Sequence, residues 1–286
     1  MSQIIFLGPE GATFSYEAYL RLSEVYNTPK VYDSSSELVS LKTNALILQT
    51  VSKSTDGYGV IAMETRAEGK VVEPVESFMD LLDGKSTVSI IGAIRMELHF
   101  ALMARKGVRL EDVRSILGHK KAIGACKGRI NHLAVDAIEK DSNGQAAEEV
   151  AHNNVYRDCG ALSIKKAAEK YGLNVLVDSF EDERAVTTFF LLGPSKSISK
   201  VGMINRALVV CKLRHKCGSL VDALIPFRDE GISLIHIHSV YIGNGEYGFV
   251  MEAEVSSEQV QSFHKAVRRF KSQVLSSLVF GPFEIV

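Results

Sequence analysis

The chain has 286 residues, which is enough for two domains that each bury their own core. Its net charge of −1, from 33 basic and 34 acidic residues, creates no overall field that would attract nucleic acid or an anionic membrane. Four cysteines without CxxC spacing indicate reduced thiols, and no apolar stretch is long enough to span a bilayer or to form a signal segment. We therefore expect a soluble, cytoplasmic protein that binds neither nucleic acid nor membranes and holds its ligands through local groups.

Strand and helix signals alternate over the first 194 residues. Short apolar runs predict strands at Ile4–Leu7, Gly59–Met63, Val88–Met96 with the run to Met103, Ser115–Gly118, Gly160–Ile164 and Val186–Leu192. Helical spacing predicts helices that begin near Thr13 and His119, that pass through Val75 to Leu82, and that cover Gln145–Val150 and Lys165–Tyr171. This alternation is typical of an α/β domain with a largely parallel sheet.

A polar stretch rich in Ser and Lys, residues 195–205, separates residues 1–194 from residues 206–286 and indicates a linker between two domains. The elements predicted after it are strand Ala207–Leu213, helix Gly218–Arg228, strands Leu234–Tyr241 and Tyr247–Val255, helix Ser257–Phe270 and strand Leu278–Phe283. Their βαββαβ order is the ferredoxin-like arrangement. Asn244-Gly245 is predicted as the turn of the central hairpin, because both residues tolerate positive φ.

Four segments, in the same order along the chain, resemble the motifs of the prephenate dehydratase family. They are Phe6–Ala18 (FLGPEGATFSYEA), Gly59–Gly69 (GVIAMETRAEG), Leu117–Leu176 and Ala185–Gly193 (AVTTFFLLG). The tail resembles an ACT domain, with CGSL at residues 217–220 and GISLIHIHS at residues 231–239 where the phenylalanine-binding signatures of these enzymes lie. The resemblance implies a two-lobed, periplasmic-binding-protein-like (type II) catalytic domain with its site in the interlobe cleft, followed by a ferredoxin-like ACT domain. It also implies prephenate as substrate, no cofactor, no metal, and a homodimer or dimer of dimers.

The chain departs from the family's pattern within these motifs. The family's Pro-Ile-Glu-Asn-Ser becomes Ala62-Met63-Glu64-Thr65-Arg66, which removes an amide and adds a guanidinium. Its Ser-His-Pro-Gln becomes Gly118-His119-Lys120-Lys121, and the Gln before Cys126 becomes Ala125. Its Asn-x-Thr-Arg-Phe becomes Ala185-Val186-Thr187-Thr188-Phe189, which keeps the Thr and the Phe but loses the Arg.

These departures point to a changed reaction. Dehydration of prephenate expels the ring carboxylate as CO2 together with the C4 hydroxide, and it needs an acid beside the leaving hydroxyl. Losing several groups suited to this step should nearly abolish it, because one such donor typically contributes about a hundredfold or more in rate. The altered motifs resemble those of the non-aromatising prephenate decarboxylases of antibiotic pathways, which implies a carbon–carbon lyase that makes dihydro-4-hydroxyphenylpyruvate. The alternatives are a divergent prephenate dehydratase that makes phenylpyruvate, and an inactive ACT-regulated sensor.

Three residues are candidates for catalysis, and each has a structural alternative. Arg66 either pairs with a substrate carboxylate or is a surface arginine on a loop. His119 either donates a proton or caps a helix start, and Thr187 either orients the substrate or simply favours a strand. The candidates for substrate binding are Gly11, in a glycine-rich loop suited to an anion, and Thr13, Glu64, Thr65, Lys121, Thr188 and Phe189.

The tail contains a separate candidate site for an effector. Gly218, Ser219 and Leu220 would present backbone N–H groups of a helix start to a carboxylate, together with Ser239. Where phenylalanine-regulated relatives have Glu-Ser-Arg-Pro, this chain has His238-Ser239-Val240-Tyr241, so we do not expect feedback by phenylalanine. A structural role in dimerisation is an equally good interpretation of this domain.

Overall fold

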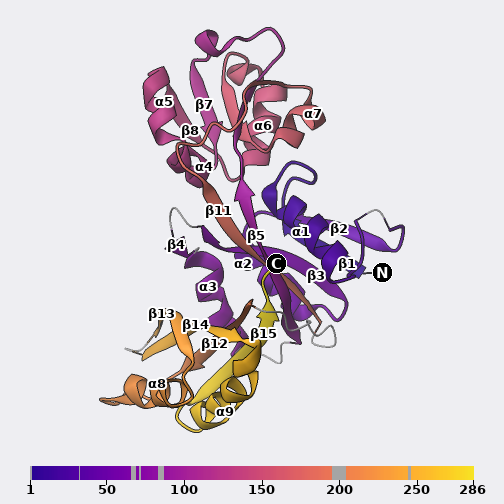
Figure 1. The fold of residues 1–286 in the computed structure, drawn as a ribbon. Coiled ribbons are helices and arrows are strands. Elements are labelled where there is room, and N and C mark those ends of the chain that lie inside the picture. The colour runs from indigo at the N-terminus through magenta and orange to yellow at the C-terminus, as the bar shows by residue number, and fades with distance from the viewer. Residues whose placement is uncertain are drawn as a thin grey trace.

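The computed structural model describes residues 2–31, 33–65, 69–70, 72–82, 87–194, 204–243 and 246–286. Within these ranges the chain forms three units, each built around one sheet. Lobe 1 comprises residues 2–98 and 185–194, lobe 2 comprises residues 99–184, and the C-terminal unit comprises residues 204–286. Figure 1 shows lobe 2 at the top, lobe 1 in the middle and the C-terminal unit at the bottom, so lobe 1 lies between the other two.

Lobe 1 has a mixed sheet with the strand order β2-β1-β3-β11-β5, and β4 pairs with β3. Its strands are β1 (Ser2–Leu7), β2 (Ser36–Leu41), β3 (Gly57–Thr65), β4 (Gly69–Lys70), β5 (Val88–Leu98) and β11 (Ala185–Pro194). Its helices are α1 (Phe14–Val25), α2 (Asn44–Lys53), α3 (Val72–Ser77) and the 3-10 helix η1 (Phe78–Leu81). β1 pairs in parallel with β2 and β3, whereas β11 runs antiparallel to both β3 and β5. The prediction of a largely parallel sheet is therefore wrong here, because β11 enters the sheet on its way back from lobe 2.

Lobe 2 has the strand order β10-β6-β9-β7-β8. Its strands are β6 (Ala101–Ala104), β7 (Ser115–Gly118), β8 (Asp136–Glu139), β9 (Gly160–Ser163) and β10 (Asn174–Val177). Its helices are η2 (Leu110–Asp112), α4 (Lys120–Ala125), α5 (Lys127–Leu133), α6 (Asn143–His152), η3 (Asn154–Tyr156) and α7 (Lys165–Tyr171). The parallel strands β8-β7-β9 repeat the order of β2-β1-β3 in lobe 1. Both lobes are thus built on one β-α-β-α-β pattern.

Two adjacent strands connect the lobes. β5 leads into lobe 2, and β11 returns beside it with Ala185 opposite Leu98. At the crossing, the backbone N–H of Phe180 donates to the carbonyl of Phe100 at 2.6 Å. The buried carboxylate of Glu181 also accepts a hydrogen bond from the backbone N–H of Phe100 at 2.9 Å. These bonds fix the two connecting segments to each other.

The C-terminal unit has an antiparallel sheet with the order β13-β14-β12-β15. Its elements are β12 (Ile204–Lys212), α8 (Ser219–Asp229), β13 (Ser233–Gly243), β14 (Glu246–Ser256), η4 (Ser257–Gln259), α9 (Val260–Lys271) and β15 (Ser276–Glu284). The predicted ferredoxin-like βαββαβ order is confirmed, and the predicted turn at Asn244-Gly245 lies outside the described residues. The predicted linker ends too late, because Ile204 and Asn205 already pair with Ser256 and Val255.

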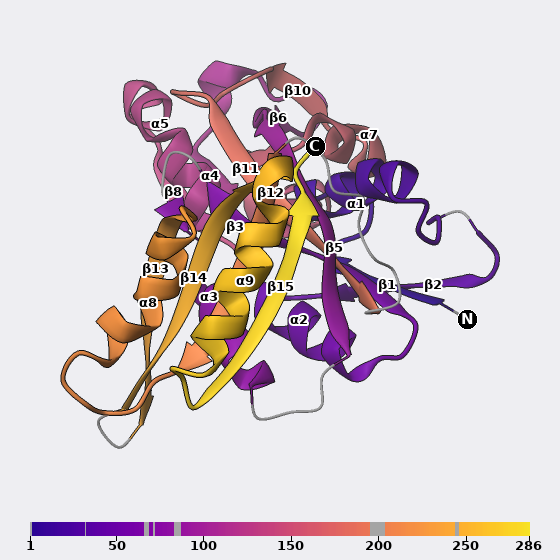
Figure 2. The ribbon, with the colours of Figure 1, turned by 60° about the horizontal axis from the view of Figure 1, so that its bottom comes forward.

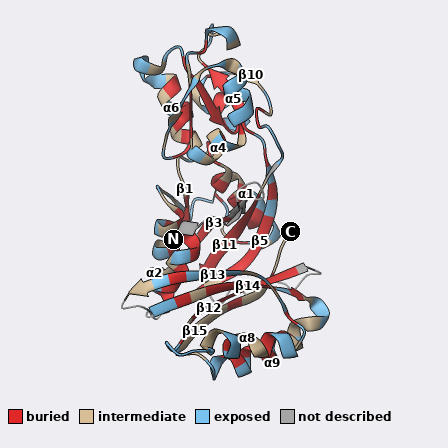
Figure 3. Ribbon diagram, turned by 90° about the vertical axis from the view of Figure 1, so that its left-hand side faces the viewer, coloured by how far each residue is buried: buried red, intermediate tan, exposed pale blue. Residues whose placement is uncertain are grey.

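Both faces of this sheet are covered. Helices α8 and α9 pack on one face, where Phe227, Phe263 and Phe270 are almost fully buried. The other face packs on lobe 1, where the ring centroids of Phe280 and Phe78 lie 5.4 Å apart. Figure 3 shows the buried residues along the three sheets and the helices of the C-terminal unit on its outer side.

The end of the chain ties the C-terminal unit to the connecting strand β5, and Figure 2 shows β15 beside β5. The backbone N–H of Val286 donates to Ala93, and that of Arg95 donates to Val286, both at 2.9 Å. The hydroxyl of Tyr26 donates to the carbonyl of Glu284 at 3.2 Å. The C-terminal unit is therefore fixed to lobe 1 by backbone hydrogen bonds as well as by apolar packing.

Two features expected from composition have a direct structural counterpart. The four cysteines are free thiols, as predicted; Cys126, Cys159 and Cys211 are buried, whereas Cys217 is exposed. Burial raises the pKa of the Cys126 and Cys211 thiols to about 12, so both stay protonated at neutral pH. None of the helices in the described part of the chain is both long enough and apolar enough to cross a membrane.

Candidate functional site

A cavity of about 1490 Å³ opens between the lobes and extends along lobe 1 to β13 of the C-terminal unit. We call its interlobe part the cleft. The ends of β1, β3, β5 and β11 and the starts of α1 and α2 form the lobe 1 wall, and the starts of α4 and α6 form the lobe 2 wall. The apolar part of the cleft wall consists of Leu7, Phe14, Ala62, Leu98, Phe100, Ala122, Ala125 and Phe189. The cleft therefore combines a large apolar wall with polar helix starts.

Four helices begin at the cleft, and each begins at a residue that suits a helix cap. Thr13 caps α1, Thr43 caps α2, His119 caps α4 and Ser142 caps α6. In each case the side chain accepts a hydrogen bond from a backbone N–H of the first turn, which satisfies one of the donors that a helix start leaves open. The positive ends of α1, α2 and α6 therefore face the cleft and favour an anion there.

The β11 residues of the predicted site do not all reach the cleft. Thr187 and Phe189 are 2% and 3% exposed and line it, as the sequence predicts. Thr188 is buried but does not line the cavity, since successive residues of a strand point to opposite faces of the sheet. Thr188 as a substrate contact therefore has no support from the cavity lining and stays a prediction.

His119 and Lys121 both line the cleft at the start of α4. The Nδ1 atom of His119 accepts a hydrogen bond from the backbone N–H of Lys121 at 3.4 Å, so the predicted helix cap is present. Burial is the main cause that lowers the pKa of His119, followed by the positive charges of Lys121 and Lys120. These lysines outweigh the opposite effect of Glu139 and Asp141, so the local field at His119 is positive.

The glycine-rich loop after β1 does not form an open anion-binding loop. Thr13 lines the cleft, but its hydroxyl donates to the carbonyl of Leu7 at 2.7 Å and caps α1. Gly11 has a φ of +68° and does not line the cavity. The loop packs against lobe 2, where Ala12 is fully buried in the lobe 2 core and Lys170 donates to the carbonyl of Glu10. Gly11 as a substrate contact stays a prediction that the cavity lining does not support, because this long-range packing occupies the loop.

Three predicted residues follow one another at the end of β3. The backbones of Glu64 and Thr65 pair with Thr188 and Thr187 of β11, so both residues lie beside the β11 part of the site. Their side chains are not described. Arg66 lies outside the described residues, and its assignment stays a prediction.

Two asparagines that sequence reasoning missed line the cleft. Asn44 is the first residue of α2 and Asn143 is the first residue of α6, so one comes from each lobe. A signal for them is present in the sequence, since Thr43-Asn44 and Ser142-Asn143 each place an asparagine after the hydroxyl cap of a helix. Sequence reasoning overlooked it because Thr43-Asn44 lies outside the four segments that resemble the family, and Ser142-Asn143 lies within Leu117–Leu176 but outside the motifs compared there.

Only two of the four predicted effector residues line a second, smaller pocket of about 170 Å³. Ser219 and Leu220 line it together with Arg214, His215 and Lys216. Gly218 precedes α8 with a φ of +85°, which favours glycine, and it is not part of the lining. Ser239 is exposed on β13 and also lies outside the lining, so the assignments of Gly218 and Ser239 to an effector stay predictions. The described residues contain no group of three or more His, Cys, Asp or Glu arranged to hold a metal ion.

Comparisons with known proteins agree with this architecture. Residues 4–197 match the family model described as prephenate dehydratase. The prephenate dehydratase of Corynebacterium glutamicum is 30% identical over 241 residues, which cover 82% of this chain and 72% of that protein. The solved structure of prephenate dehydratase from Arthrobacter aurescens in complex with L-Phe has a TM-score of 0.81 and 22% identity, and the match covers 99% of this chain and 89% of that one. GqqA, described as a novel type of quorum-quenching acylase, has a TM-score of 0.76 and 20% identity, with 98% of both chains covered.

The two solved structures show the fold alone, because their identities to this chain are 22% and 20%. The family match is more specific, since it spans both lobes and the cleft between them. The predicted fold class, a two-lobed, periplasmic-binding-protein-like α/β part with a ferredoxin-like unit after it, is confirmed. The chain belongs to the prephenate dehydratase family.

Proposed function

We propose that this chain decarboxylates prephenate without aromatising the ring and releases dihydro-4-hydroxyphenylpyruvate. The observation that carries this proposal is Ala125, which lines the cleft at the position where the family's motif has a glutamine. A methyl group cannot donate a proton or a hydrogen bond to a leaving hydroxyl. The described cleft wall therefore offers less help to dehydration than the family's motif does, while its helix starts still suit an anionic substrate.

The proposed reaction keeps the ring alcohol. The bond between the ring and its carboxylate breaks, and the carboxylate leaves as CO2. The electron pair of that bond moves into the ring double bonds, and one proton from the medium adds to a ring carbon. The apolar wall supports this step, because burying a carboxylate away from water favours its conversion to neutral CO2. The product cannot lead directly to phenylalanine, so it fits a pathway to a non-proteinogenic amino acid or an antibiotic.

Dehydration of prephenate to phenylpyruvate is the second candidate. The relative from Corynebacterium glutamicum with 30% identity is a prephenate dehydratase, and Thr187, which the family's motif also has, lines the cleft. Both reactions expel CO2 from the same ring carbon, and both are lyase reactions. They differ in whether the C4 hydroxide leaves with it.

Incubating the purified protein with prephenate tests the proposal. We expect prephenate to be consumed and the product to keep the hydroxyl on its ring, so that proton NMR shows a carbinol proton and no aromatic ring protons. Phenylpyruvate as the main product, detected by the absorbance of its aromatic enol, would contradict the proposal. Binding of prephenate without turnover would contradict it as well and would favour a sensor.

A variant sharpens this experiment. Ala125→Gln restores the amide of the family's motif at the cleft wall, and we expect it to raise the phenylpyruvate fraction of the product. Ala137→Gln is the matched control, because Ala137 is exposed on β8 and does not line the cavity. An equal product ratio in the two variants would remove the support that Ala125 gives.

We also propose that residues 1–194 form the catalytic domain, that the C-terminal unit is an ACT domain, and that two chains pair through the edge of β13. In the described sheet β13 pairs only with β14, and its outward residues Ile235, Ile237 and Tyr241 are 44%, 43% and 63% exposed. An exposed apolar edge strand favours pairing with another strand. Sedimentation equilibrium should give a mass that is a multiple of 31.4 kDa, and a monomer would contradict this pairing.

A further inference from the structure

Asn44 and Asn143 occupy corresponding places in the two lobes. Each is the first residue of the helix that follows the second strand of the β-α-β-α-β pattern, and each follows a hydroxyl cap. The two helices, α2 and α6, have ten residues each and both begin at the cleft. The repeated pattern therefore places one asparagine on each side of the same space.

In both side chains the hydrogen bond to the protein uses the amide oxygen and not the amide nitrogen. The Oδ1 atom of Asn44 accepts from the backbone N–H of Ala62 at 3.1 Å, and the Oδ1 atom of Asn143 accepts from that of His119 at 2.8 Å. These bonds fix which end of each amide is the nitrogen. Neither Nδ2 atom hydrogen-bonds a described residue, although Asn44 is only 9% exposed. Each amide nitrogen therefore keeps hydrogen-bonding capacity for an acceptor, and the cavity that both residues line is where that acceptor can lie.

We propose that Asn44 and Asn143 are paired carboxylate-binding residues, and that each donates its Nδ2–H to one of the two carboxylates of the substrate. This inference rests on prephenate as the substrate but not on which product forms. Each amide acts together with the positive end of its helix, which favours the same negative charge.

The groups around each asparagine indicate which of the two substrate carboxylates it binds. Asn143 holds His119, and the lobe 2 wall beside it presents Lys120, Lys121 and Lys140 against Glu139 and Asp141, so the pyruvyl carboxylate, which keeps its charge, belongs on this side. Asn44 holds Ala62, which pairs with the buried Phe189, and Lys42 nearby is exposed. The ring carboxylate belongs on this side, because the amide is neutral and Lys42, which also lines the cavity, is exposed to solvent, so little charge stabilises the carboxylate before it leaves as CO2.

Asparagine-to-aspartate variants separate this role from a structural one. Asn44→Asp and Asn143→Asp keep the oxygen that accepts the backbone hydrogen bond, and a carboxylate at a helix start favours folding. Each removes the Nδ2–H donor and places a negative charge against the substrate. A purely structural role would therefore leave substrate handling and the melting temperature as they are in the wild type.

The first readout is the kcat/KM for disappearance of prephenate, which counts either product. We expect each Asp variant to lower it about 100-fold or more, because a hydrogen bond to a charge is lost and a repulsion is added. Gln49→Glu on α2 and Asn131→Asp on α5 are the controls, since both residues are exposed and lie outside the cavity lining. Values within about twofold of the wild type in both Asp variants would overturn the inference.

The second readout is the affinity for 4-hydroxyphenylpyruvate, which has the pyruvyl carboxylate but no ring carboxylate. Asn143→Asp should weaken its binding in calorimetry, whereas Asn44→Asp should leave it within about twofold of the wild type, because independent contacts add separately. The opposite pattern would overturn the assignment of the two carboxylates. Formation of phenylpyruvate by the wild type would contradict the proposed decarboxylation but not this binding pattern, so the two failures can be told apart.

Discussion

The sequence leaves open whether His119 acts on the substrate or caps a helix, and the structure is compatible with both roles. Its Nδ1 atom accepts a backbone hydrogen bond as the cap of α4, so the neutral ring has its proton on Nε2. A second proton would have to sit on Nδ1, facing the N–H of Lys121, and would break the cap. The lowered pKa agrees with this geometry, because burial and the neighbouring lysines also disfavour the charged ring. His119 is therefore better suited to donate a hydrogen bond from Nε2 to the substrate than to protonate a ring carbon.

The titration of His119 predicts a pH dependence of stability. The unfolded chain takes up a proton at this residue near its ordinary pKa of 6.5, whereas the folded chain takes it up only at lower pH. The free energy of unfolding of the wild type should therefore fall, relative to a His119→Asn variant, as the pH drops below 6.5. Asparagine caps helices well and does not titrate there. Urea unfolding at about pH 7.5 and about pH 5.5 measures the difference, and a constant difference would contradict the prediction.

Single residues of the site could be predicted only where a family motif contains them. Thr187, Phe189, His119 and Lys121 line the cleft as expected, because motif positions map onto the same strand and helix ends. Thr188 belongs to the same motif but does not line the cleft, since motif membership does not say which face of the strand a side chain occupies.

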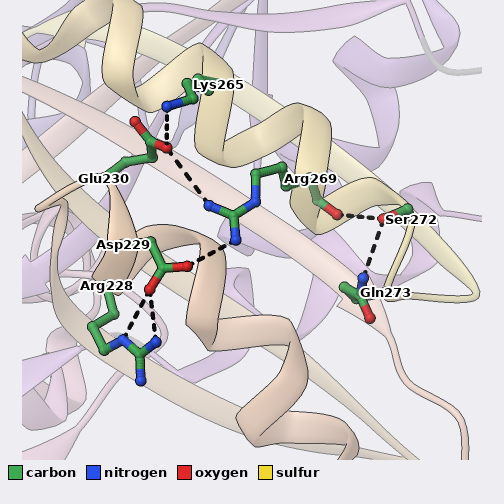
Figure 4. Close-up of polar contacts among 7 residues, drawn as sticks. All are labelled: Arg228, Asp229, Glu230, Lys265, Arg269, Ser272 and Gln273. Carbon is green, nitrogen blue, oxygen red and sulfur yellow. Dashed lines mark hydrogen bonds and ion pairs between the residues drawn. The ribbon is translucent and has the colours of Figure 1, made fainter.

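At the scale of elements, a group of charges joins α8 to α9 (Figure 4). Asp229 at the end of α8 accepts from Arg228 at 2.7 Å and from Arg269 of α9 at 2.8 Å. Glu230, whose side chain is 10% exposed, pairs with Lys265 at 2.8 Å and lies 3.6 Å from Arg269. Arg269 is the residue common to both carboxylates, so it links the end of α8 to the last turn of α9.

Arg269→Ala should therefore destabilise the protein more than a neighbouring change does. We expect a loss of about 0.5–1 kcal/mol in the free energy of unfolding, because an exposed network of ion pairs contributes little more than that. Arg268→Ala is the matched control, since Arg268 is exposed on α9 and no ion pair of Arg268 to a described residue is present. The difference between the variants should shrink in 1 M salt. Equal unfolding midpoints in low salt would show that the network does not stabilise the pair of helices.

The elements that sequence patterns missed are edge strands or follow them. β2 and β8 lie at the edges of their sheets, and exposed residues interrupt both. An edge strand is half solvated, so its composition resembles that of a loop. The central strands β1, β3 and β11, and the edge strand β5 that β15 covers, were predictable because they are largely buried and their sequences are mostly apolar runs.

At the scale of the whole molecule, the loop of residues 9–12 connects the lobes on the side away from β5 and β11. Ala12 is buried among lobe 2 residues, and the hydroxyl of Ser163 donates to its carbonyl at 3.4 Å. Gly144 at the start of α6 allows this close packing, because a Cβ there would come within 2.7 Å of Pro9 Cγ and 3.0 Å of the Ala12 carbonyl. The lobes are thus held together by a loop contact in addition to the two connecting strands.

Gly144→Ala should weaken this contact. Helix propensity alone predicts that Gly144→Ala stabilises the protein, because alanine favours a helix more than glycine does. We expect destabilisation instead, because the added methyl group would push against the loop. Overpacking of this kind typically costs about 1–3 kcal/mol, and we expect a loss of stability in that range in urea unfolding. Glu148→Ala, on the exposed side of the same helix, is the control. A Gly144→Ala protein as stable as the control would show that the loop yields at no cost.

The arrangement of whole units could be predicted only in outline. The βαββαβ order and the two lobes follow from element order and from the family motifs, since both depend on local patterns. The contact between the C-terminal sheet and lobe 1 could not be predicted, because Phe280 and Phe78 meet across some two hundred residues of chain. Neither could the loop contact with lobe 2, which brings Ala12 to Ser163.

The attachment of Val286 to β5 has a consequence for communication across the protein. β5 is one of the strands on which the lobes would turn, and its backbone atoms at Ala93 and Arg95 also hold the end of the C-terminal unit. A closing movement that displaced this strand would act on the distant unit directly. Where a ligand of the cleft and a ligand of the C-terminal unit both shift this strand, thermodynamic reciprocity requires each to alter the affinity for the other by the same factor.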